Sequence, residues 1–252
     1  MNKLLALTAA ATAIVAAAPA SATSFTFATT NGGTTTSSSD YGNARTYQAV
    51  NGAETLNVKA TAWSIGTNNI VSNAKLVSYS AGLGVINRNE TGALNTHTTD
   101  NLNGEDFILL QFSQAVSLTS AILNPYSVYF DKADNDSTVG WGTLQGAWNQ
   151  ALALNGISES SLGKMFTGTI NIASNGAATQ SYSIKGAGNL WMIGASVANP
   201  DCYTDGFKLA GVTVSSVAAV PEPATWAMML VGFGMVAATS RYRRRGTKIA
   251  YA

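Results

Sequence analysis

The stretch TLNVKATA at residues 55–62 alternates apolar and polar side chains along its length. Its apolar side chains, from Leu56 to Ala62, occupy every second position. Because successive side chains of a strand point to opposite faces, this period of two predicts a strand with one buried face. The segments FTGTINI (166–172) and QSYSIK (180–185) repeat the pattern. The body of the chain is therefore expected to consist of strands.

Three other segments depart from simple alternation. The runs FILLQF (107–112) and LWMIGA (190–195) are almost continuously apolar, which predicts strands that are covered on both faces. In GFKLAGVTVSS (206–216) the alternation changes phase at Ala210-Gly211, where a β-bulge would restore a common inward face. One helix is expected over residues 144–154, ended by Gly156.

These patterns predict a mainly β fold of about ten to twelve short strands with one or two helices at most. We expect an antiparallel, jelly-roll-like β-sandwich that occupies residues 23–219 as a single extracytoplasmic domain. A β-solenoid is the alternative, and the sequence disfavours it because no fixed period recurs.

Residues 1–22 have the pattern of a secretory signal peptide. Lys3 supplies a positive charge, Leu4 to Ala18 are uninterrupted by polar groups other than threonine, and two small-x-small exits follow. The pattern predicts passage through the Sec translocon and cleavage by signal peptidase near Ser21 or Thr23. A buried N-terminal helix is the alternative interpretation.

The segment PEPATWAMMLVGFGMVAATSRYRRR occupies residues 221–245. Ala224 to Ser240 carry no charge, and roughly 17 residues at about 1.5 Å each reach some 25 Å, the short end of a membrane-spanning helix. Trp226 is placed as an interfacial aromatic residue, and residues 246–252 would form a cytoplasmic tail. The positively charged side chains expected at the cytoplasmic face are Arg241, Arg243, Arg244 and Arg245.

Two prolines precede this apolar run. Pro221 and Pro223 fix their own backbone angles and push Val220 and Glu222 toward extended geometry. An extended peptide at the mouth of the membrane is a form that a protease can bind. A permanent C-terminal anchor is the alternative interpretation.

The triplet Pro221-Glu222-Pro223, the apolar helix and the arginine cluster together resemble the PEP-CTERM sorting signal of Gram-negative bacteria. The version PEPATWAMMLVGFG resembles the form common in alphaproteobacteria. In that family the signal is read by exosortase, a membrane-embedded cysteine transpeptidase-like enzyme that cuts near the triplet. The resemblance implies export through the inner membrane, transient residence there, and a cell-surface or extracellular location after C-terminal processing.

The body of the chain resembles a family of exosortase-dependent surface proteins. The resemblance rests on GLGV (82–85) with Asn87, HTTDN (97–101), FILLQF, VSLTS (116–120) and DNDSTV (134–139). No enzymatic activity is attached to that family, so the resemblance implies a non-enzymatic role.

Composition restricts the possible partners. Residues 23–220 contain eight Lys and Arg against twelve Asp and Glu, so the body is mildly acidic, and no basic patch indicates nucleic-acid binding. Cys202 is the single cysteine, so no intramolecular disulfide is expected, and His97 is the single histidine. Because neither lies in a recognisable motif, we do not expect a Cys–His catalytic pair.

Two polar groups are candidate sites. The segment DKADNDS (131–137) offers Asp131, Asp134 and Asp136 as calcium ligands, although a solvated turn has the same composition. His97 and Asp100 precede the strand FILLQF and are candidates for ligand binding. Apart from possible calcium, no cofactor is expected.

Three functions are compatible with these observations. The first is a non-enzymatic, exosortase-sorted protein with a structural or adhesive role in the envelope, exopolysaccharide or biofilm matrix. The second is a carbohydrate-binding module for extracellular polysaccharide, which would use exposed rings such as Trp141, Trp148, Tyr126 and Tyr129. Core packing is the commoner place for such rings. The third is a hydrolase, which requires converging carboxylates or His97 in a cleft.

Overall fold

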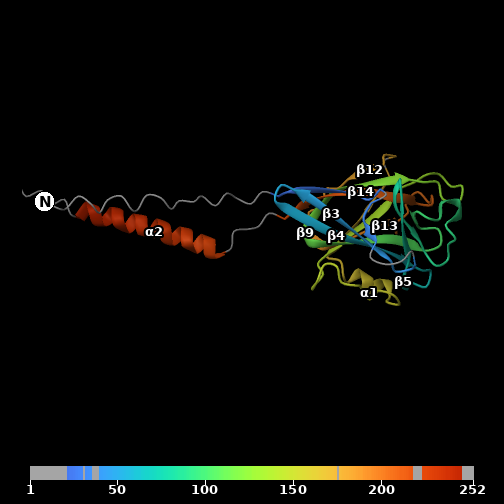
Figure 1. Ribbon diagram of the computed structural model, residues 1–252, viewed down its shortest axis with the longest axis horizontal. Helices are drawn as coiled ribbons and strands as arrows, with labels where there is room; N and C mark the ends of the chain where they lie inside the picture. Colours follow the sequence, from blue (N-terminus) through green and yellow to red (C-terminus); the bar gives the residue numbers. More distant parts are fainter. Residues whose placement is uncertain (1–21, 31, 36–39, 175, 218–222, 246–252) are drawn as a thin grey trace, which may run out of the picture. The chain divides into compact units, whose positions relative to one another are not determined.

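The computed structural model describes residues 22–30, 32–35, 40–174, 176–217 and 223–245. Residues 22–217 form one compact unit, the β domain (Figure 1). Helix α2 (Pro223–Arg245) belongs to a second unit. Most of the predicted signal peptide, Pro221, Glu222 and the predicted tail at 246–252 lie outside the described residues.

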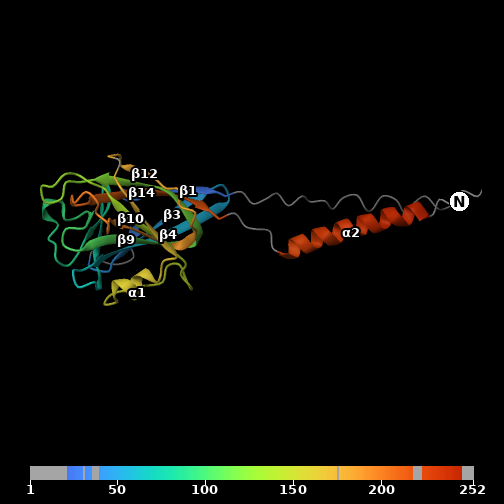
Figure 2. The ribbon, with the colours of Figure 1, turned by 180° about the vertical axis from the view of Figure 1, so that it is seen from behind.

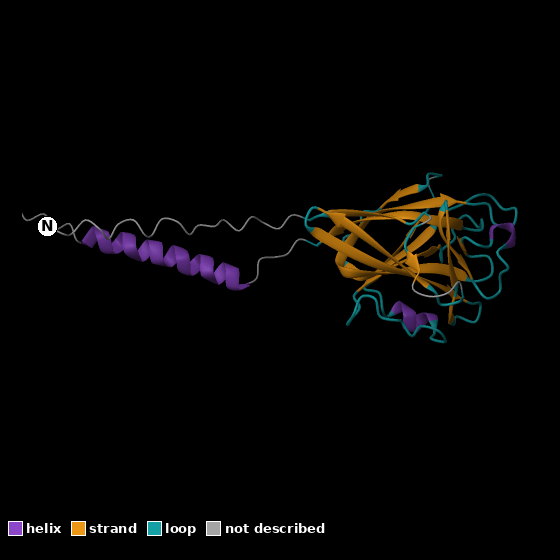
Figure 3. Ribbon diagram, viewed as in Figure 1, coloured by secondary structure: helices purple, strands orange, loops and turns teal. Residues whose placement is uncertain are grey.

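The β domain is built from strands joined by loops, as the colouring by secondary structure shows (Figure 3). Its described residues form fourteen strands in one branched sheet, and every named strand pair is antiparallel. The strands are β1 (Ser24–Ala28), β2 (Thr34–Thr35), β3 (Ala44–Asn51), β4 (Glu54–Ile65), β5 (Val71–Asn73), β6 (Lys75–Tyr79), β7 (Gly82–Ile86), β8 (Thr99–Asp100), β9 (Glu105–Pro125), β10 (Ser137–Gly142), β11 (Gly168–Ile172), β12 (Thr179–Ser181), β13 (Gly188–Ala195) and β14 (Gly206–Ser216). This confirms the prediction of a mainly β, antiparallel fold, and the jelly-roll topology stays a prediction.

Strand β9 organises the sheet because its two halves have different neighbours. Residues 107–111 pair with β13 on one side and with β4 on the other. Residues 116–125 pair instead with β14, and residues 120–122 also pair with β12. The view from behind shows β1 alongside β14 (Figure 2). β1 pairs with residues 211–215 of β14. One long strand thus joins two groups of strands around the main core.

Both faces of the first half of β9 are buried, as its continuous apolar sequence predicts. Ile108, Leu110 and Phe112 lie in the main core. Phe107 and Leu109 lie in a second core. The run LWMIGA in β13 is likewise buried at every position. Both predictions of doubly covered strands are confirmed.

The predicted bulge in β14 is also present. Its register on β9 shifts between Leu209 and Gly211, and again between Thr213 and Val214. The first shift brings Leu209 and Val212 into the same core although they differ in parity.

The helix expected over residues 144–154 is absent; this segment is a loop. Three of its backbone carbonyls accept hydrogen bonds from side chains of β4 and β9. The Lys59 ammonium donates to the carbonyls of Asn149 and Gln150, and the Gln111 amide donates to those of Trp148 and Gln150. These tertiary contacts override the helical periodicity of the segment.

The two described α-helices lie elsewhere in the sequence. Helix α1 (Glu159–Gly163) begins after Ser158, whose hydroxyl accepts a hydrogen bond from the Ser161 amide. Helix α2 covers the segment where the sequence predicts a membrane span. Within the described part of the chain, however, no helix has both the length and the apolar character needed to cross a membrane. The predicted span is therefore not confirmed.

Candidate functional site

Six carboxylates gather in two clusters, which are formed by loop residues together with residues of β8 and β9. We call Asp134, Asp136 and Asp205 the Asp205 cluster. The second group, the Glu90 cluster, comprises Glu90, Asp100 and Asp106. Within each cluster, one carboxylate oxygen from each residue lies within 4.8 Å of the others. Five of the six side chains are almost completely shielded from solvent, and Glu90 is 8% exposed.

Strand β8 links the clusters. Asp100 belongs to the Glu90 cluster and pairs with Gly206, the residue that follows Asp205. The next residue, Asn101, contacts the other cluster: its amide nitrogen Nδ2 donates to Asp205 Oδ2 over 2.7 Å. The Asp205 amide donates in return to Asn101 Oδ1 over 3.0 Å. Asp100 and Asn101, which are adjacent in sequence, therefore contact different clusters.

The carboxylates of the Asp205 cluster are held by N–H donors. Asp205 Oδ2 also accepts from the Ser196 amide over 3.1 Å. Asp134 Oδ1 accepts from the Asn135 amide over 2.7 Å, and Asp136 Oδ1 accepts from the Ser174 amide. Asp205 Oδ1 is buried and has no hydrogen-bond partner among the described residues.

Burial and like charges shift the titration of this cluster. Burial, followed by the charges of Asp136 and Asp134, raises the pKa of Asp205 to about 8. Burial also raises the pKa of Asp134, and contact with the Asp201 carboxyl and the charge of Asp136 act in the same direction. Burial and neighbouring carboxylates thus disfavour the ionisation of Asp205 and Asp134.

The Glu90 cluster is organised by Asn87. The Asn87 side-chain amide donates to Asp106 Oδ1 over 3.1 Å, and its backbone amide donates to Glu90 Oε2 over 3.1 Å. Asp100 accepts from the Thr98 hydroxyl and from the Leu102 amide, each over 3.1 Å. Glu90 Oε1 and Asp106 Oδ2 are buried and find no partner within the described ranges.

The same physical causes act on this second cluster. Burial, followed by the charge of Glu90, raises the pKa of Asp100 to about 8. Burial, then the charges of Glu90 and Asp100, hold the pKa of Asp106 well above its usual range. Burial also raises the pKa of Glu90.

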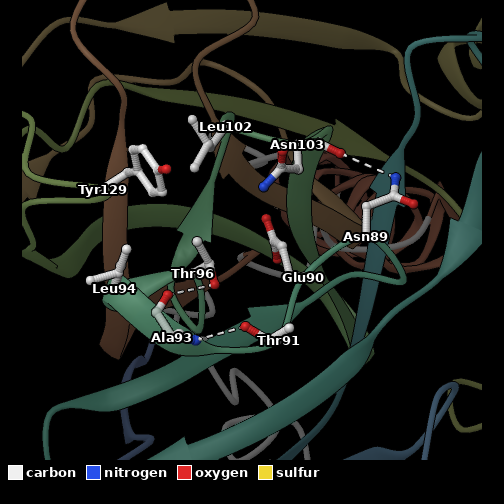
Figure 4. A pocket seen from close by; sticks show the side chains of 9 residues that line it. All are labelled: Asn89, Glu90, Thr91, Ala93, Leu94, Thr96, Leu102, Asn103 and Tyr129. Atoms are coloured by element: carbon white, nitrogen blue, oxygen red, sulfur yellow. Dashed lines mark hydrogen bonds between the residues drawn. The ribbon is translucent and has the colours of Figure 1, made fainter.

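A pocket of about 380 Å³ lies against the Glu90 cluster. The close view shows the Glu90 carboxylate pointing toward Asn103, with Tyr129 and Leu94 on another side of the pocket (Figure 4). The remaining lining residues are Asn89, Thr91, Ala93, Thr96 and Leu102. The pocket thus combines amide, hydroxyl and carboxylate groups with one aromatic ring.

Residues 219–245 match the family model of the PEP-CTERM protein-sorting motif. The chain carries a PEP-CTERM sorting motif. The motif implies exosortase-dependent processing, export, and a cell-surface or extracellular location. The match lies outside the β domain, so the resemblance of the body to exosortase-dependent surface proteins stays a prediction. No curated protein and no solved structure matches the chain.

The PEP-CTERM motif contains several residues that the sequence analysis selected. Pro223 is the first residue of α2, whereas Pro221 and Glu222 precede the described part of that helix. Arg241 is exposed. The structure does not describe the side chains of the other flanking residues: Trp226, Arg243, Arg244 and Arg245.

In the β domain of this PEP-CTERM protein, Asp134 and Asp136 come together as predicted, but Asp131 does not join them. Its carboxylate instead accepts hydrogen bonds from the Lys132 and Thr204 amides, each over 2.8 Å. Asp205, which the sequence analysis did not select, completes the cluster. No local motif identifies Asp205. It reaches the cluster through the pairing of β14, which begins at the next residue.

His97, Asp100 and Trp141, the three residues predicted to bind a ligand, do not come together in one site. Asp100 belongs to the Glu90 cluster, whereas the His97 ring packs edge-on against Tyr79, with 4.9 Å between ring centroids. Burial lowers the pKa of His97, and the nearby charge of Lys208 lowers it further. Trp141 packs against Trp191 at 6.2 Å and belongs to the periphery of the main core. Glu90 was not selected, and its acidic neighbours are separated from it in sequence.

Proposed function

We propose that the β domain is a non-enzymatic component of the cell surface, with a structural or adhesive role in the envelope, exopolysaccharide or biofilm matrix. The observation that carries the proposal is the PEP-CTERM sorting motif at residues 219–245, which directs a separate compact domain to exosortase. Delivery to the surface, rather than chemistry, is then the purpose of the C-terminal segment.

The environment of the acidic residues supports a non-enzymatic role. A glycosidase needs two carboxylates that face a substrate at separations of about 5 to 9.5 Å. Of the six clustered carboxylates, only Glu90 lines the pocket described above, and N–H donors hold the three carboxylates of the Asp205 cluster. His97, the single histidine, packs against Tyr79 and joins neither cluster.

The sorting step is tested by the intact mass of the mature protein, taken separately from the cell surface and from the medium. We expect an N-terminus near Ser21 or Thr23 and a C-terminus between Pro221 and Ala224. A mass that retains Arg241 to Arg245 would contradict processing at the motif and favour a permanent anchor.

The matrix role is tested in the producing bacterium. A deletion strain should form a less cohesive surface matrix, and the full chain should restore cohesion. A chain without residues 219–245 is the control and should not restore it, because its domain is not sorted. Unchanged cohesion in the deletion strain would contradict the matrix role.

One observation favours carbohydrate binding as a second candidate function. Tyr129 and Phe130 are 61% and 84% exposed, with ring centroids 6.1 Å apart, and Tyr129 lines the pocket. Both have positive φ, 49° and 68°, a conformation that non-glycine residues adopt at a cost. The backbone thus adopts an unfavourable conformation at the two residues whose rings are exposed beside polar groups. This arrangement is suited to stacking on sugars.

The test is retention of the full chain on the cell's own extracellular polysaccharide. Tyr129→Ala and Phe130→Ala should each reduce retention at least about tenfold, since each removes a stacking surface. Tyr41→Ala, at another exposed ring, is the matched control and should bind like the wild type. Equal retention of all variants would contradict this candidate function.

A further inference from the structure

We propose that the Asp205 cluster binds one Ca²⁺ ion, coordinated by the carboxylates of Asp134, Asp136 and Asp205. The site lies within the β domain and is independent of the sorting motif. It differs from the site predicted from the local sequence because Asp205 replaces Asp131.

The first argument is electrostatic. Three carboxylates are removed from water within 4.8 Å of one another, and a fourth, Asp201, contacts Asp134. The hydrogen bonds that Asp205 and Asp134 accept from described residues come from amide groups and not from a lysine or arginine. Buried carboxylates of this kind are normally paired with cations or coordinate metal ions. A divalent cation supplies the missing positive charge.

The second argument is the unpartnered oxygen. Asn101 and Ser196 hold Asp205 through Oδ2. Its Oδ1 is buried with no hydrogen-bond donor among the described residues, an unfavourable state for a polar atom. A bound cation would satisfy this oxygen. The donors on Oδ2 then have the role of outer-shell groups, which orient a metal ligand and fix its position.

The third argument is distance. Two oxygens bound to one Ca²⁺ at about 2.3–2.6 Å lie at most about 5 Å apart. The carboxylate oxygens of the cluster are within 4.8 Å of one another and so already satisfy this limit. Asp201 is exposed and touches Asp134, so it is available as a further ligand from the solvent side.

The donor set selects the class of metal. All three ligands offer oxygen, and neither His97 nor Cys202 belongs to the cluster, whereas zinc sites favour nitrogen and sulfur. Mg²⁺ demands near-octahedral geometry and keeps several waters, which a buried group of three carboxylates does not favour. Ca²⁺ accepts irregular oxygen coordination and combines carboxylates with water.

A separate observation carries a second Ca²⁺ site at the Glu90 cluster. Two of its buried oxygens, Glu90 Oε1 and Asp106 Oδ2, have no hydrogen-bond partner in the described part of the chain. Asn87 holds the other oxygen of each carboxylate. Glu90 also lines the adjacent pocket, where its carboxylate points toward Asn103 (Figure 4).

The test is the number of Ca²⁺ ions bound by the full chain, purified in a mild detergent, stripped with a chelator and titrated with CaCl₂. Native mass spectrometry should count two ions on the wild type. Asp205→Asn should bind one ion, because Asn keeps an oxygen for Asn101 and Ser196 but loses the charge. Asp106→Asn should also bind one. The control Asp131→Asn, from the same loop as Asp134, should bind two.

Each outcome decides one site. If Asp205→Asn binds as many ions as the wild type, the Asp205 site is overturned, and the same result for Asp106→Asn overturns the Glu90 site. A wild type without Ca²⁺ overturns both. Thermal unfolding shows whether the variants are folded: without Ca²⁺, Asp205→Asn should unfold no earlier than the wild type, because a neutral amide replaces a buried carboxyl group whose ionisation is disfavoured. With Ca²⁺, the increase in its Tm should be smaller than that of the wild type.

Discussion

Gly84 in β7 lies directly against the backbone of His97. A Cβ atom at this position would lie 2.0 Å from the His97 carbonyl oxygen, too close for any adjustment short of moving the main chain. We therefore expect Gly84→Ala to reduce the free energy of unfolding by about 3 kcal/mol or more. Urea denaturation of the purified full chain measures this loss. Gly163→Ala is the control, because no atom lies within 4 Å of the Cβ it would add, and it should change stability little.

Asp205 and Asp100 make the metal-free protein sensitive to pH. Burial raises the pKa of each to about 8, from a model-peptide value near 3.8. Between these values the folded state holds protons that the unfolded state has lost, so stability falls as pH rises from about 4 to about 8. The urea midpoint of the metal-free chain should accordingly be lower at pH 8 than at pH 5. Asp205→Asn should reduce this difference, and a midpoint that rises with pH would contradict the assignment.

The strands that the sequence predicts best are those with unambiguous local patterns. Alternation identifies β4, and the continuous apolar runs identify the doubly buried parts of β9 and β13. The phase change in β14 even locates its bulge. Strand pairing is different, because it depends on contacts between residues far apart in the chain. No local pattern shows that one strand, β9, joins both groups of strands.

The candidate site follows the same division. Asp134 and Asp136 occur in the short polar segment DKADNDS, and Asp100 occurs in HTTDN, so the local sequence identifies all three as candidates. Asp205 and Glu90 become partners of these residues only through strand pairing and loop packing. Sequence thus identifies local groups of ligands, whereas the complete clusters require the tertiary structure.

Two adjacent residues of β9 test its doubly buried character. Leu110 lies in the main core and Leu109 in the second core, and both are almost completely buried. We expect Leu109→Ala and Leu110→Ala each to cost about 2–5 kcal/mol of unfolding free energy, measured by urea denaturation. Ile122→Ala is the control in the same strand, because Ile122 is 39% exposed, and it should cost less than about 1 kcal/mol. A tolerant Leu109 would show that the second core contributes little.

Lys59 tests what holds the loop over residues 143–158 in place. Its ammonium donates to the Asn149 and Gln150 carbonyls over 3.0 and 2.8 Å. Lys59→Met keeps an apolar stem but removes both hydrogen bonds, so amide exchange should accelerate in this loop and stay unchanged in β9. Hydrogen–deuterium exchange measures the difference. The control Lys164→Met, at an exposed position, should leave exchange in the loop unaltered; unaltered exchange in Lys59→Met would mean that Gln111 and apolar packing suffice.

The first and last strands of the β domain, β1 and β14, pair with each other. Strand β1 pairs with β14 from Ser24 opposite Ser215 to Ala28 opposite Gly211. The main core begins at Phe25 and ends at Val214. Cleavage of the predicted signal peptide before Thr23 and of the sorting segment after Val217 would therefore remove no core residue. This arrangement suits a domain that is trimmed at both ends during export.

Trimming the C-terminus at two points tests this arrangement. A chain that ends at Val217 should keep the urea midpoint of the full chain, with a difference in unfolding free energy within about 0.5 kcal/mol, because all paired strand residues remain. A chain that ends at Gly211 loses Val212, Val214 and most of the β1 pairing, and should no longer unfold cooperatively. Loss of cooperativity in the chain ending at Val217 would show instead that the sorting segment is part of the folded domain, and that processing at the PEP-CTERM motif alters its structure.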